Sequence, residues 1–383
     1  MQQRPKVLCL SSWYPNQLKP TEGNFVEQHL RVSSTIADVA LLHVVLSEQH
    51  QALTIEEKQL PYYEKVIYIP RNKTLFVGKI ISYIQVLLTY WKHALQTPIG
   101  KPDLIHGAVL YPIGLVGLLL KWRFRIPLVF SEHWTCYHPY TNPQPTPWQK
   151  IMLKFIGNRS QLLLPVSLDL ASAMHQFGIT SPMKVVANVV DTSIFTPKVQ
   201  RPHNNFRFVH VSSLDPIQKN FHLLVNAFYE LKKQQNNVEL HVVSDGDFNS
   251  YKKIIEGFEF ADSIHFHGQQ DAQGVAAIMQ FADAFVLSSR YENLPCVLLE
   301  ALSTGTPMIA THVGGVAEII NSGNGILIPT EDKTALLEAM KSIQQQNFAA
   351  EAMHLEAQQK YSPTAIAAQL QEAFHQVLTP NVP

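Results

Sequence analysis

Short apolar segments alternate with longer amphipathic segments along the whole chain. In the first half, segments rich in valine, isoleucine and leucine lie at 6–10, 39–45, 103–107, 127–131 and 162–167. Stretches with helical spacing of apolar residues lie between them, such as those at 23–35 and 79–96. Buried strands that alternate with helices predict a parallel sheet with helices on both faces.

The second half repeats this pattern. Predicted strands lie at 206–214, 238–246, 264–268, 283–289, 307–312 and 325–329, and predicted helices at 221–235, 274–280 and 294–304. A length of 383 residues is also long for a single core. The chain is therefore predicted to be an α/β protein with two Rossmann-like, doubly wound domains, and a ligand is expected between them.

The segment 195–208 carries prolines, asparagines and charges without apolar periodicity, so we expect a linker there between domains at 1–198 and 206–362. A helical tail follows residue 328. Tyr361-Ser362-Pro363 interrupts it, and a last helix is expected to start near Pro363.

Composition narrows the class of protein. Hydrophobic residues make up 46% and charged residues 16%, which is typical of a globular protein with large cores. The three cysteines are far apart, so a disulfide framework or zinc knuckle is not indicated and a reducing compartment is favoured. The N-terminus lacks the pattern of a signal peptide, and glycines and prolines break the apolar stretch 104–122. We therefore expect a cytoplasmic protein.

Charge is unevenly spread. Residues 1–200 hold 19 basic and 11 acidic residues, whereas residues 201–383 hold 11 basic and 19 acidic ones. In the first half, basic residues recur beside apolar ones at 71–79 and 121–125, and at Lys150, Lys154 and Arg159. They form either solvated surface or a face for an anionic membrane or a phosphorylated acceptor. Nucleic acid is not expected, because no known reading motif accompanies the charge.

Two glutamates bracket the segment between Glu292 and Glu300. Pro295 suits the first turn of a helix, and Gly305 suits its left-handed end. Glu292 is therefore predicted to lie in the loop before this helix and Glu300 inside it, where they would reach different parts of one ligand. A strand-to-helix loop favours an anion, and carboxylates bind the hydroxyls of a sugar ring well. The arrangement suits a diphosphate between two hydroxyl-bearing rings.

The run SSRYENLPCVLLEALSTGTPMIATHVGGVAEII at 288–320 resembles the signature of the family-four retaining glycosyltransferases, which have the GT-B fold. Two further segments resemble other motifs of this family: the strand and turn at 209–228 and ANVVDTSIF at 187–195. LSSWYPNQLKPTEGNFVEQH at 10–29 and SEHWT at 131–135 resemble acceptor-side motifs of members that build surface polysaccharides or lipopolysaccharide. The resemblance implies that the last helix, about 363–379, crosses back to the N-terminal domain.

The resemblance implies roles for residues on the donor side. Glu292 matches the glutamate at the transferred sugar, and Glu300 matches the one that binds the ribose hydroxyls. Lys219 matches the lysine that neutralises the diphosphate. Backbone N–H groups after the first glutamate bind the sugar and diphosphate, which here implicates Asn293, Leu294 and Cys296, since Pro295 has no N–H.

One position departs from the family pattern. Ser213 stands where the family often has an arginine, so either Lys219 neutralises the diphosphate alone or another cation compensates. Arg290 is a candidate for that phosphate contact, and a surface arginine is the alternative. Asp245-Gly246-Asp247 looks like a metal motif, but it matches a structural turn of the family.

On the acceptor side, His133 matches a histidine near the donor sugar and the acceptor. Gly23 matches a glycine where backbone must approach the donor phosphates closely. Neither a metal nor another cofactor is expected, because the histidines show no paired ligand spacing on a helix and the lysine replaces the metal.

The resemblance predicts transfer of a sugar from a nucleotide-diphosphate sugar to an acceptor hydroxyl, with retention at the anomeric carbon. A uridine diphosphate sugar is favoured over GDP-mannose because it is the commoner donor in the family. The basic first half and the apolar helix at 79–95 suit a lipid-linked or membrane-borne acceptor, and they allow peripheral contact with the inner face of the plasma membrane. A sugar-nucleotide epimerase or a non-catalytic binder on the same fold is the alternative, whereas an oxidoreductase would need a G-x-G-x-x-G motif.

Overall fold

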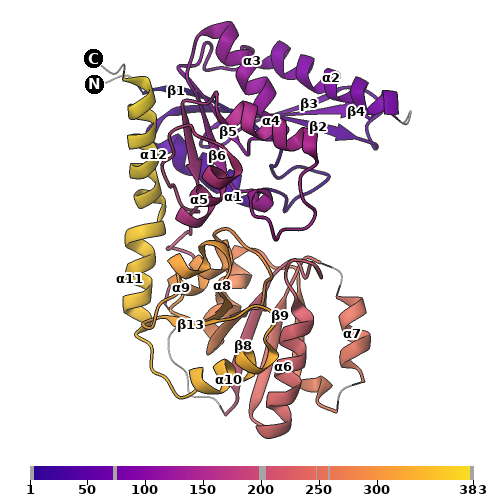
Figure 1. The fold of residues 1–383 in the computed structure, drawn as a ribbon, viewed down its shortest axis with the longest axis vertical. Coiled ribbons are helices and arrows are strands. Elements are labelled where there is room, and N and C mark those ends of the chain that lie inside the picture. Colours follow the sequence, from indigo (N-terminus) through magenta and orange to yellow (C-terminus); the bar gives the residue numbers. More distant parts are fainter. Residues whose placement is uncertain (1–3, 72–75, 198–203, 247, 258, 380–383) are drawn as a thin grey trace.

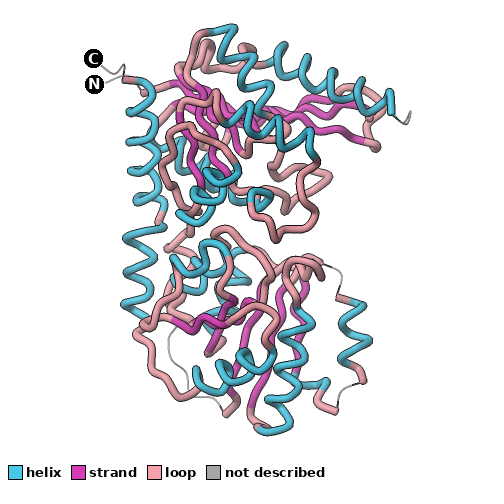
Figure 2. Tube along the Cα trace, in the orientation of Figure 1, coloured by secondary structure: helices cyan, strands magenta, loops and turns pink. Residues whose placement is uncertain are grey.

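A computed structural model of the chain describes residues 4–71, 76–197, 204–246, 248–257 and 259–379. Its strands form two sheets, one from strands before residue 166 and the other from strands after residue 205. Helices flank each sheet, and the two units lie one above the other (Figure 1). The helices lie outside and the strands inside, as Figure 2 shows. The two Rossmann-like units of the predicted fold are confirmed.

The first sheet has seven strands in the order β3-β4-β2-β1-β5-β6-β7, and only β3 runs antiparallel to its neighbour. The strand order reverses at β1, which pairs with both β2 and β5. The strands are β1 Lys6–Ser11, β2 Asp38–Ser47, β3 Thr54–Gln59, β4 Tyr63–Pro70, β5 Leu104–Ala108, β6 Leu128–Glu132 and β7 Leu162–Pro165.

The second sheet has six parallel strands in the order β10-β9-β8-β11-β12-β13. Here the order reverses between β8 and β11, and such a switch point is where doubly wound folds bind ligands. The strands are β8 Phe206–Val211, β9 Val238–Val243, β10 Ile264–Gly268, β11 Ala284–Leu287, β12 Met308–Thr311 and β13 Gly325–Ile328.

The α-helices of the first unit are α1 Asn24–Ile36, α2 Phe76–His93, α3 Gly114–Phe124, α4 Pro147–Gly157 and α5 Leu168–Phe177. Those after residue 205 are α6 Phe221–Gln234, α7 Asn249–Ile255, α8 Ala272–Phe281, α9 Cys296–Ser303, α10 Lys333–Ile343, α11 Ala350–Tyr361 and α12 Pro363–Leu378. Short 3-10 turns lie at Thr135–Tyr137, Ala261–Ser263 and Gly314–Glu318. Among the described residues, none of these helices combines the length and the apolar character that crossing a membrane requires.

The hairpin β3–β4 was not predicted. Charged residues interrupt its apolar pattern, and the structure shows where those charges go. Lys65 and Glu64 on β4 are buried, and they pair with Glu57 at 2.9 Å and Lys58 at 3.3 Å on β3. Cross-strand ion pairs at the edge of the sheet thus allow a charged segment to form a strand.

The helical tail joins the two units. α11 packs against α9 of the second unit, and α12 then packs against α1 of the first, as Figure 1 shows in yellow. Lys184 and Glu372 on α12 form an ion pair at 2.6 Å. The tail therefore breaks at Ser362-Pro363 as predicted. The domain limits 1–198 and 206–362 remain predictions, and residues 198–203 of the expected linker lie outside the described residues.

Candidate active site

A pocket of about 490 Å³ opens between the two units. On one side lie the loops that follow β8 and β11, which flank the switch point of the second sheet. On the other side lie residues after β1 and β6, including Trp13, Phe25 and His133. The pocket brings together six of the predicted site residues, namely His133, Lys219, Glu292, Asn293, Leu294 and Cys296.

Lys219 and Glu292 meet in this pocket although 73 residues separate them. Lys219 Nζ lies 2.5 Å from Glu292 Oε1, and Ser289 Oγ donates to the same oxygen at 2.7 Å. Gln218 Nε2 donates to the other carboxylate oxygen at 3.4 Å. The side chains of Lys219 and Glu292 are 15% and 7% exposed. The second unit thus holds a cation and a carboxylate, largely shielded from water, where a charged ligand would lie.

The helix after Glu292 forms as predicted. Pro295 is the N-cap of α9, and Gly305 has φ +64° just beyond its end. Gly314 and Gly315 pack against the backbone of the loop that carries Glu292 and Asn293. A Cβ on Gly314 would lie 1.9 Å from the carbonyl oxygen of Glu292. The N–H of Gly315 donates to the carbonyl oxygen of Asn293 at 2.7 Å. These glycines allow close backbone packing, which fixes the position of Glu292.

Arg290 does not line the pocket. Its guanidinium donates to the carbonyls of Pro216 at 2.7 Å and Ile217 at 3.0 Å, and to Asn220 Oδ1 at 2.9 Å. It also pairs with Glu331. Arg290 therefore braces the loop that carries Lys219, and its contact with phosphate stays a prediction.

Three further predicted residues lie outside the lining of the pocket: Gly23, Ser213 and Glu300. Gly23 has φ +75° at the N-cap of α1, and a Cβ there would lie 2.6 Å from the carbonyl group of Trp13, which does line the pocket. Ser213 is exposed, and its carbonyl oxygen lies 1.9 Å from where a Cβ of Gly246 would be. This close packing fits the structural turn expected at Gly246; Asp247 lies outside the described residues.

Glu300 lies inside α9, half-buried, and this burial raises the pKa of its carboxyl to about 7. Burial also raises the pKa of the Cys296 thiol to about 12, with the charges of Glu300 and Glu292 adding to the effect. Cys296 is therefore a neutral thiol, and its contribution to the pocket is its place at the start of a helix.

His133 follows β6 and packs against Phe25, with ring centroids 4.3 Å apart. The buried carboxylate of Glu132 shapes the turn around it, because it accepts the N–H groups of His133 at 2.9 Å and Trp134 at 2.8 Å. It also accepts the hydroxyl of Tyr137 at 2.8 Å. The sequence motif SEHWT thus encodes a carboxylate that holds the histidine in position.

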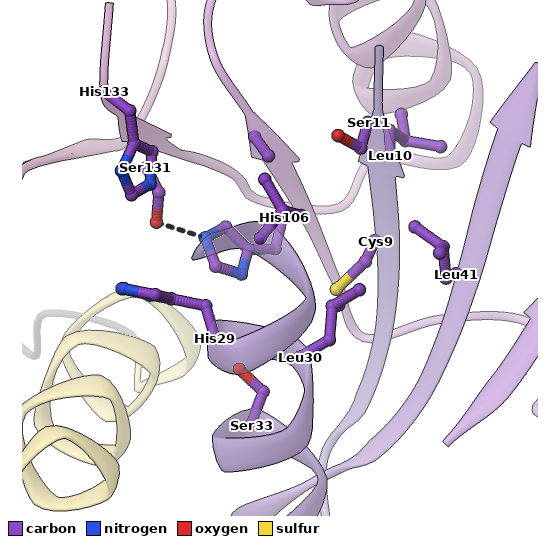
Figure 3. A pocket seen from close by; sticks show the side chains of 12 residues that line it. Cys9, Leu10, Ser11, His29, Leu30, Ser33, Leu41, His106, Ser131 and His133 are labelled. Atoms are coloured by element: carbon purple, nitrogen blue, oxygen red, sulfur yellow. Dashed lines mark hydrogen bonds between the residues drawn. The ribbon is translucent and has the colours of Figure 1, made fainter. Parts of the chain in front are cut away.

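Behind His133, His29 and His106 surround a small cavity, as Figure 3 shows. The rings of His29 and His133 meet edge to face at 5.4 Å, and His106 Nε2 lies 2.8 Å from Ser131 Oγ. Burial lowers the pKa of His29 to about 4, that of His106 to about 3 and that of His133 well below its usual value. His133 is therefore neutral at pH 7 and can exchange hydrogen bonds with a ligand.

Hydrogen bonds join the two units around the pocket. Asn293 Nδ2 donates to the His133 carbonyl at 2.6 Å, Asn188 Nδ2 to the Leu294 carbonyl at 2.6 Å, and the Tyr291 hydroxyl to the Asn142 carbonyl at 2.9 Å. Glu318, in the second unit, accepts two backbone N–H groups in the first turn of α5, from Leu168 at 3.0 Å and Asp169 at 2.9 Å. The loop of Glu292 and Asn293 thus contacts the other unit directly.

Sequence reasoning missed several residues of this site: Glu132, Asn188, Gln218, Ser289, Tyr291 and Glu318. Apart from Ser289, which donates to Glu292 three residues along the chain, each acts through a contact with a segment distant in sequence or with backbone, as in the bonds above. Local spacing carries no signal for such contacts. The quoted motifs nevertheless contain all six and were a signal that could have found them: Glu132 is in SEHWT, Asn188 in ANVVDTSIF, Gln218 in 209–228, and Ser289, Tyr291 and Glu318 in 288–320.

Within the described part of the chain, one group of side chains has the composition of a metal site. Ligand atoms of Glu239, His241 and His265 lie within 4.8 Å of one another on β9 and β10, and none of the three lines the pocket. The expectation that no metal binds rested on the spacing of histidines along helices. This group is instead formed by residues on two neighbouring strands. It stands apart from the candidate active site.

Two family models match the chain. One, described as "Glycosyltransferase Family 4", matches residues 42–194, and the other, "Glycosyl transferases group 1", matches residues 205–346. Each match lies within one of the two units of the fold, and the signature at 288–320 falls within the second match.

Curated relatives are distant. The chain is 26% identical over 197 residues to the putative colanic acid biosynthesis glycosyltransferase WcaL of Escherichia coli, over 49% of this chain and 48% of that protein. It is 26% identical over 323 residues to alpha-monoglucosyldiacylglycerol synthase of Streptococcus pneumoniae, over 75% of this chain and 70% of that protein. The chain thus spans about half the length of the colanic acid enzyme.

Solved structures share the fold. Sucrose-phosphate synthase from Thermosynechococcus elongatus has a TM-score of 0.77 at 19% identity, with 97% of this chain and 98% of that chain covered. Anabaena HepE in complex with UDP-glucose has a TM-score of 0.70 at 20% identity, with 97% and 100% covered. These structures show that the chain shares their fold. The two family models, which together match residues 42–194 and 205–346, identify the chain as a member of the family-four, group 1 glycosyltransferases.

Proposed function

We propose that the chain is a metal-independent, retaining hexosyltransferase that takes its sugar from a UDP-sugar and builds a cell-surface polysaccharide or a glycolipid. The observation that carries this proposal is the pair of Lys219 and Glu292 in the pocket between the units. The UDP-glucose bound to HepE supports the choice of donor over GDP-mannose, and the names of the two curated relatives support the class of acceptor.

On the donor side, Lys219 neutralises the charge that develops on the leaving diphosphate. The backbone around Asn293, Leu294 and Cys296 and the N-terminal end of α9 add positive potential there. When the donor binds, its phosphates compete with Glu292 for the lysine, which frees the carboxylate for hydroxyls of the transferred sugar. Glu300 binds the ribose hydroxyls, and the loop of Ser213, braced by Arg290, lies beside the phosphates.

The transfer step needs no protein nucleophile. The acceptor hydroxyl attacks the anomeric carbon on the face that the diphosphate leaves, and the diphosphate takes the hydroxyl proton, so the configuration is retained. Neutral His133 accepts or donates a hydrogen bond beside the reacting sugar. Gly23 permits the close packing of α1 against the Trp13 backbone. Contacts between the units, such as Asn293 to His133, hold the reactants together and exclude water.

We also propose that the first unit contacts the cytoplasmic face of an anionic membrane. Large apolar side chains are exposed on three helices, with Leu88 and Trp91 on α2, Trp122 on α3 and Trp148 on α4. α3 contacts both α2 and α4, so these side chains share one region of the first unit. Exposed tryptophans flanked by cations suit the interface of an anionic bilayer. The flanking cations are Lys92, Lys121, Arg123, Arg125, Lys150 and Lys154.

Thermal melting with UDP-, GDP- and ADP-sugars, in EDTA, tests the donor site. A ligand that binds only the folded chain raises the melting temperature. We expect a rise with one UDP-sugar, lost in Glu300→Ala and kept in the matched surface variant Glu338→Ala. A rise that requires metal, or that GDP-sugars alone produce, would contradict the proposal. Conversion of the UDP-sugar to its epimer without any acceptor would favour the epimerase instead.

A further inference from the structure

A second pocket, of about 380 Å³, lies in the first unit beside the candidate active site. The segment 12–22 after β1, the end of β2, helix α2 and the start of α3 enclose it. Trp13 lines both this pocket and the pocket that holds Lys219 and Glu292. The two pockets are therefore neighbours that share a wall.

Most of the second pocket is apolar. Val86 and Leu87 on α2 face Ile113 and Val116 at the start of α3, and Val44 and Leu46 on β2 complete the wall. Two tyrosines of α2 hold this wall in place through their hydroxyls. That of Tyr90 donates to the Ser11 carbonyl at 2.8 Å, and that of Tyr83 to the Pro112 carbonyl at 3.4 Å. A ligand that fills this part of the pocket has to be a hydrocarbon.

Polar residues also line the second pocket: Ser12, Asn16, Lys19 and Glu22 in the segment after β1, and His43 on β2. Lys19 and Glu22 pair with each other at 2.6 Å. His43 is 2% exposed, and its Nδ1 lies 2.7 Å from the Ser11 carbonyl. Because a carbonyl only accepts, Nδ1 carries the proton, and Nε2 is a bare acceptor. That Nε2 and Ser12 Oγ are buried with no hydrogen-bond partner in the structure. Buried polar atoms normally have a partner, so both are suited to a ligand hydroxyl.

Resting on the function proposed above, we propose that this second pocket binds the acceptor, and that the acceptor is an amphiphile: a hydroxyl-bearing head at Ser12, His43 and Trp13, with a long hydrocarbon chain along α2 and α3. The head then reaches the donor sugar past Trp13. The acceptor oxygen bonds to the anomeric carbon, the bond from that carbon to the diphosphate breaks, and the hydroxyl proton leaves with the diphosphate.

Helix α2 connects this pocket to the proposed membrane surface. One face of the helix, with Val86, Leu87 and Tyr90, lines the pocket, and the other exposes Ile84, Leu88 and Trp91. A chain drawn from a bilayer at the exposed face has only to pass around one helix to enter the pocket. This arrangement of α2 favours a membrane lipid over a water-soluble sugar as the acceptor. Both a polyprenyl carrier and an acyl lipid have the required chemistry.

Leu87 and Leu88 offer a matched pair for the test, because Leu87 lines the pocket whereas its neighbour Leu88 is exposed on an adjacent face of α2. The binding assay uses a dansyl-labelled undecanoate, whose emission rises in an apolar pocket, with the full chain. Dodecyl glucoside should displace it and methyl glucoside should not. Leu87→Glu, and Leu87→Trp as a filling variant, should weaken probe binding at least about tenfold, the equivalent of two buried methylenes. Leu88→Glu should not.

The transfer assay compares methyl and octyl glycosides of the same sugar, below the micelle concentration, with the donor found by thermal melting. We expect kcat/KM to favour the octyl acceptors at least about tenfold. That ratio should fall toward one in both Leu87 variants and persist in Leu88→Glu. Melting with the UDP-sugar verifies that each variant is folded. Farnesyl phosphate and a short-chain diacylglycerol, offered as competitors, distinguish a polyprenyl carrier from an acyl lipid.

The proposal is overturned if wild-type protein shows no preference for the octyl acceptors, or if Leu87→Glu and Leu88→Glu behave alike. Its failure is distinct from that of the proposed function. Probe binding without any UDP-sugar binding would refute sugar transfer, and with it the acceptor role. If the UDP-sugar binds and methyl and octyl acceptors are used equally, the proposed transferase function stands and the lipid pocket is refuted.

Discussion

The two neighbouring pockets differ in whether their charged side chains are buried. In the donor pocket, charges neutralise one another within the protein: Lys219 pairs with Glu292, whose carboxylate also accepts from Ser289. In the second pocket, the ion pair of Lys19 and Glu22 is solvent-accessible, with side chains 63% and 31% exposed. Its buried atoms without a partner, His43 Nε2 and Ser12 Oγ, belong to an imidazole and a hydroxyl. The difference matches the ligands proposed. A diphosphate requires a cation that the protein holds in position. An amphiphile requires a largely apolar pocket with a few hydrogen-bonding atoms.

The same contrast runs through the two units. The first unit carries the excess of basic residues and the exposed tryptophans, and the second carries the excess of acidic residues. The dianionic donor proposed above would therefore depend on a few local cations in an acidic unit, and among the described residues Lys219 is the lysine that lines this pocket. The largest effects are expected where this local arrangement is broken.

Lys219→Ala should have the largest effect. Removing the group that stabilises charge on the leaving diphosphate should lower kcat by about 10²–10³-fold, as for other single electrostatic groups in active sites. Turnover with a saturating UDP-sugar measures it. Lys333→Ala, which changes an exposed lysine of the same unit, should leave kcat unchanged. Melting temperature separates catalysis from folding, because the substitution also leaves Glu292 buried without its cation. Wild-type turnover in Lys219→Ala would contradict the donor assignment.

Local sequence predicted the donor side far better than the second pocket, for physical reasons. Pro295 and Gly305 mark the limits of α9, so the places of Glu292 and Glu300 follow from helix chemistry alone. Alternating apolar segments predicted eleven strands, but the charged hairpin β3–β4 was missed because its charges pair across strands. Contacts between distant segments, such as Tyr291 to Asn142, leave no local pattern. The pocket beside His43 likewise arises from four separate segments.

Glu300 should make the donor unit sensitive to pH. Burial raises its pKa to about 7 in the folded chain, above the unfolded value of 4.5. As pH rises from about 4.5 to 7, the unfolded chain loses this proton first, so the folded state loses stability over that window. We expect a loss of about 2 kcal/mol, less than the full shift would give because the side chain is half-buried. Glu300→Gln should remove this part of the pH dependence in urea titrations.

Donor binding should follow the opposite course. A carboxylate accepts two ribose hydroxyls, whereas the protonated acid accepts fewer. Affinity for UDP should therefore rise as pH increases through about 7 in the wild type and stay flat in Glu300→Gln. The exposed Glu338→Gln serves as the control in both experiments. A stability profile that is the same in wild type and Glu300→Gln would mean that Glu300 ionises normally in the folded chain.

The proposed membrane surface should respond to single charges. Arg123 on α3 and Lys150 on α4 are exposed. Replacing either by glutamine should weaken partition to phosphatidylglycerol vesicles about fivefold, since each cation near an anionic surface contributes about 1 kcal/mol. Co-sedimentation at low and high salt measures the effect, and the difference should vanish at high salt. Lys333→Gln in the other unit is the charge-matched control. Equal losses in all three variants would mean that net charge alone, and not this surface, drives the binding.

Tyr291→Phe should have the smallest effect on kcat/KM of the changes considered. It tests whether contact between the two units contributes to turnover. The change removes the hydrogen bond to the Asn142 carbonyl, so about 1 kcal/mol of contact between the units is lost. If that contact holds the units closed over the donor, kcat/KM should fall about fivefold with little change in melting temperature. Tyr62→Phe is the control, because its hydroxyl bonds to Tyr14 within the first unit. It should lower melting temperature and spare kcat/KM. The reverse pattern would show that Tyr291 serves stability alone and that the donor pocket closes without it.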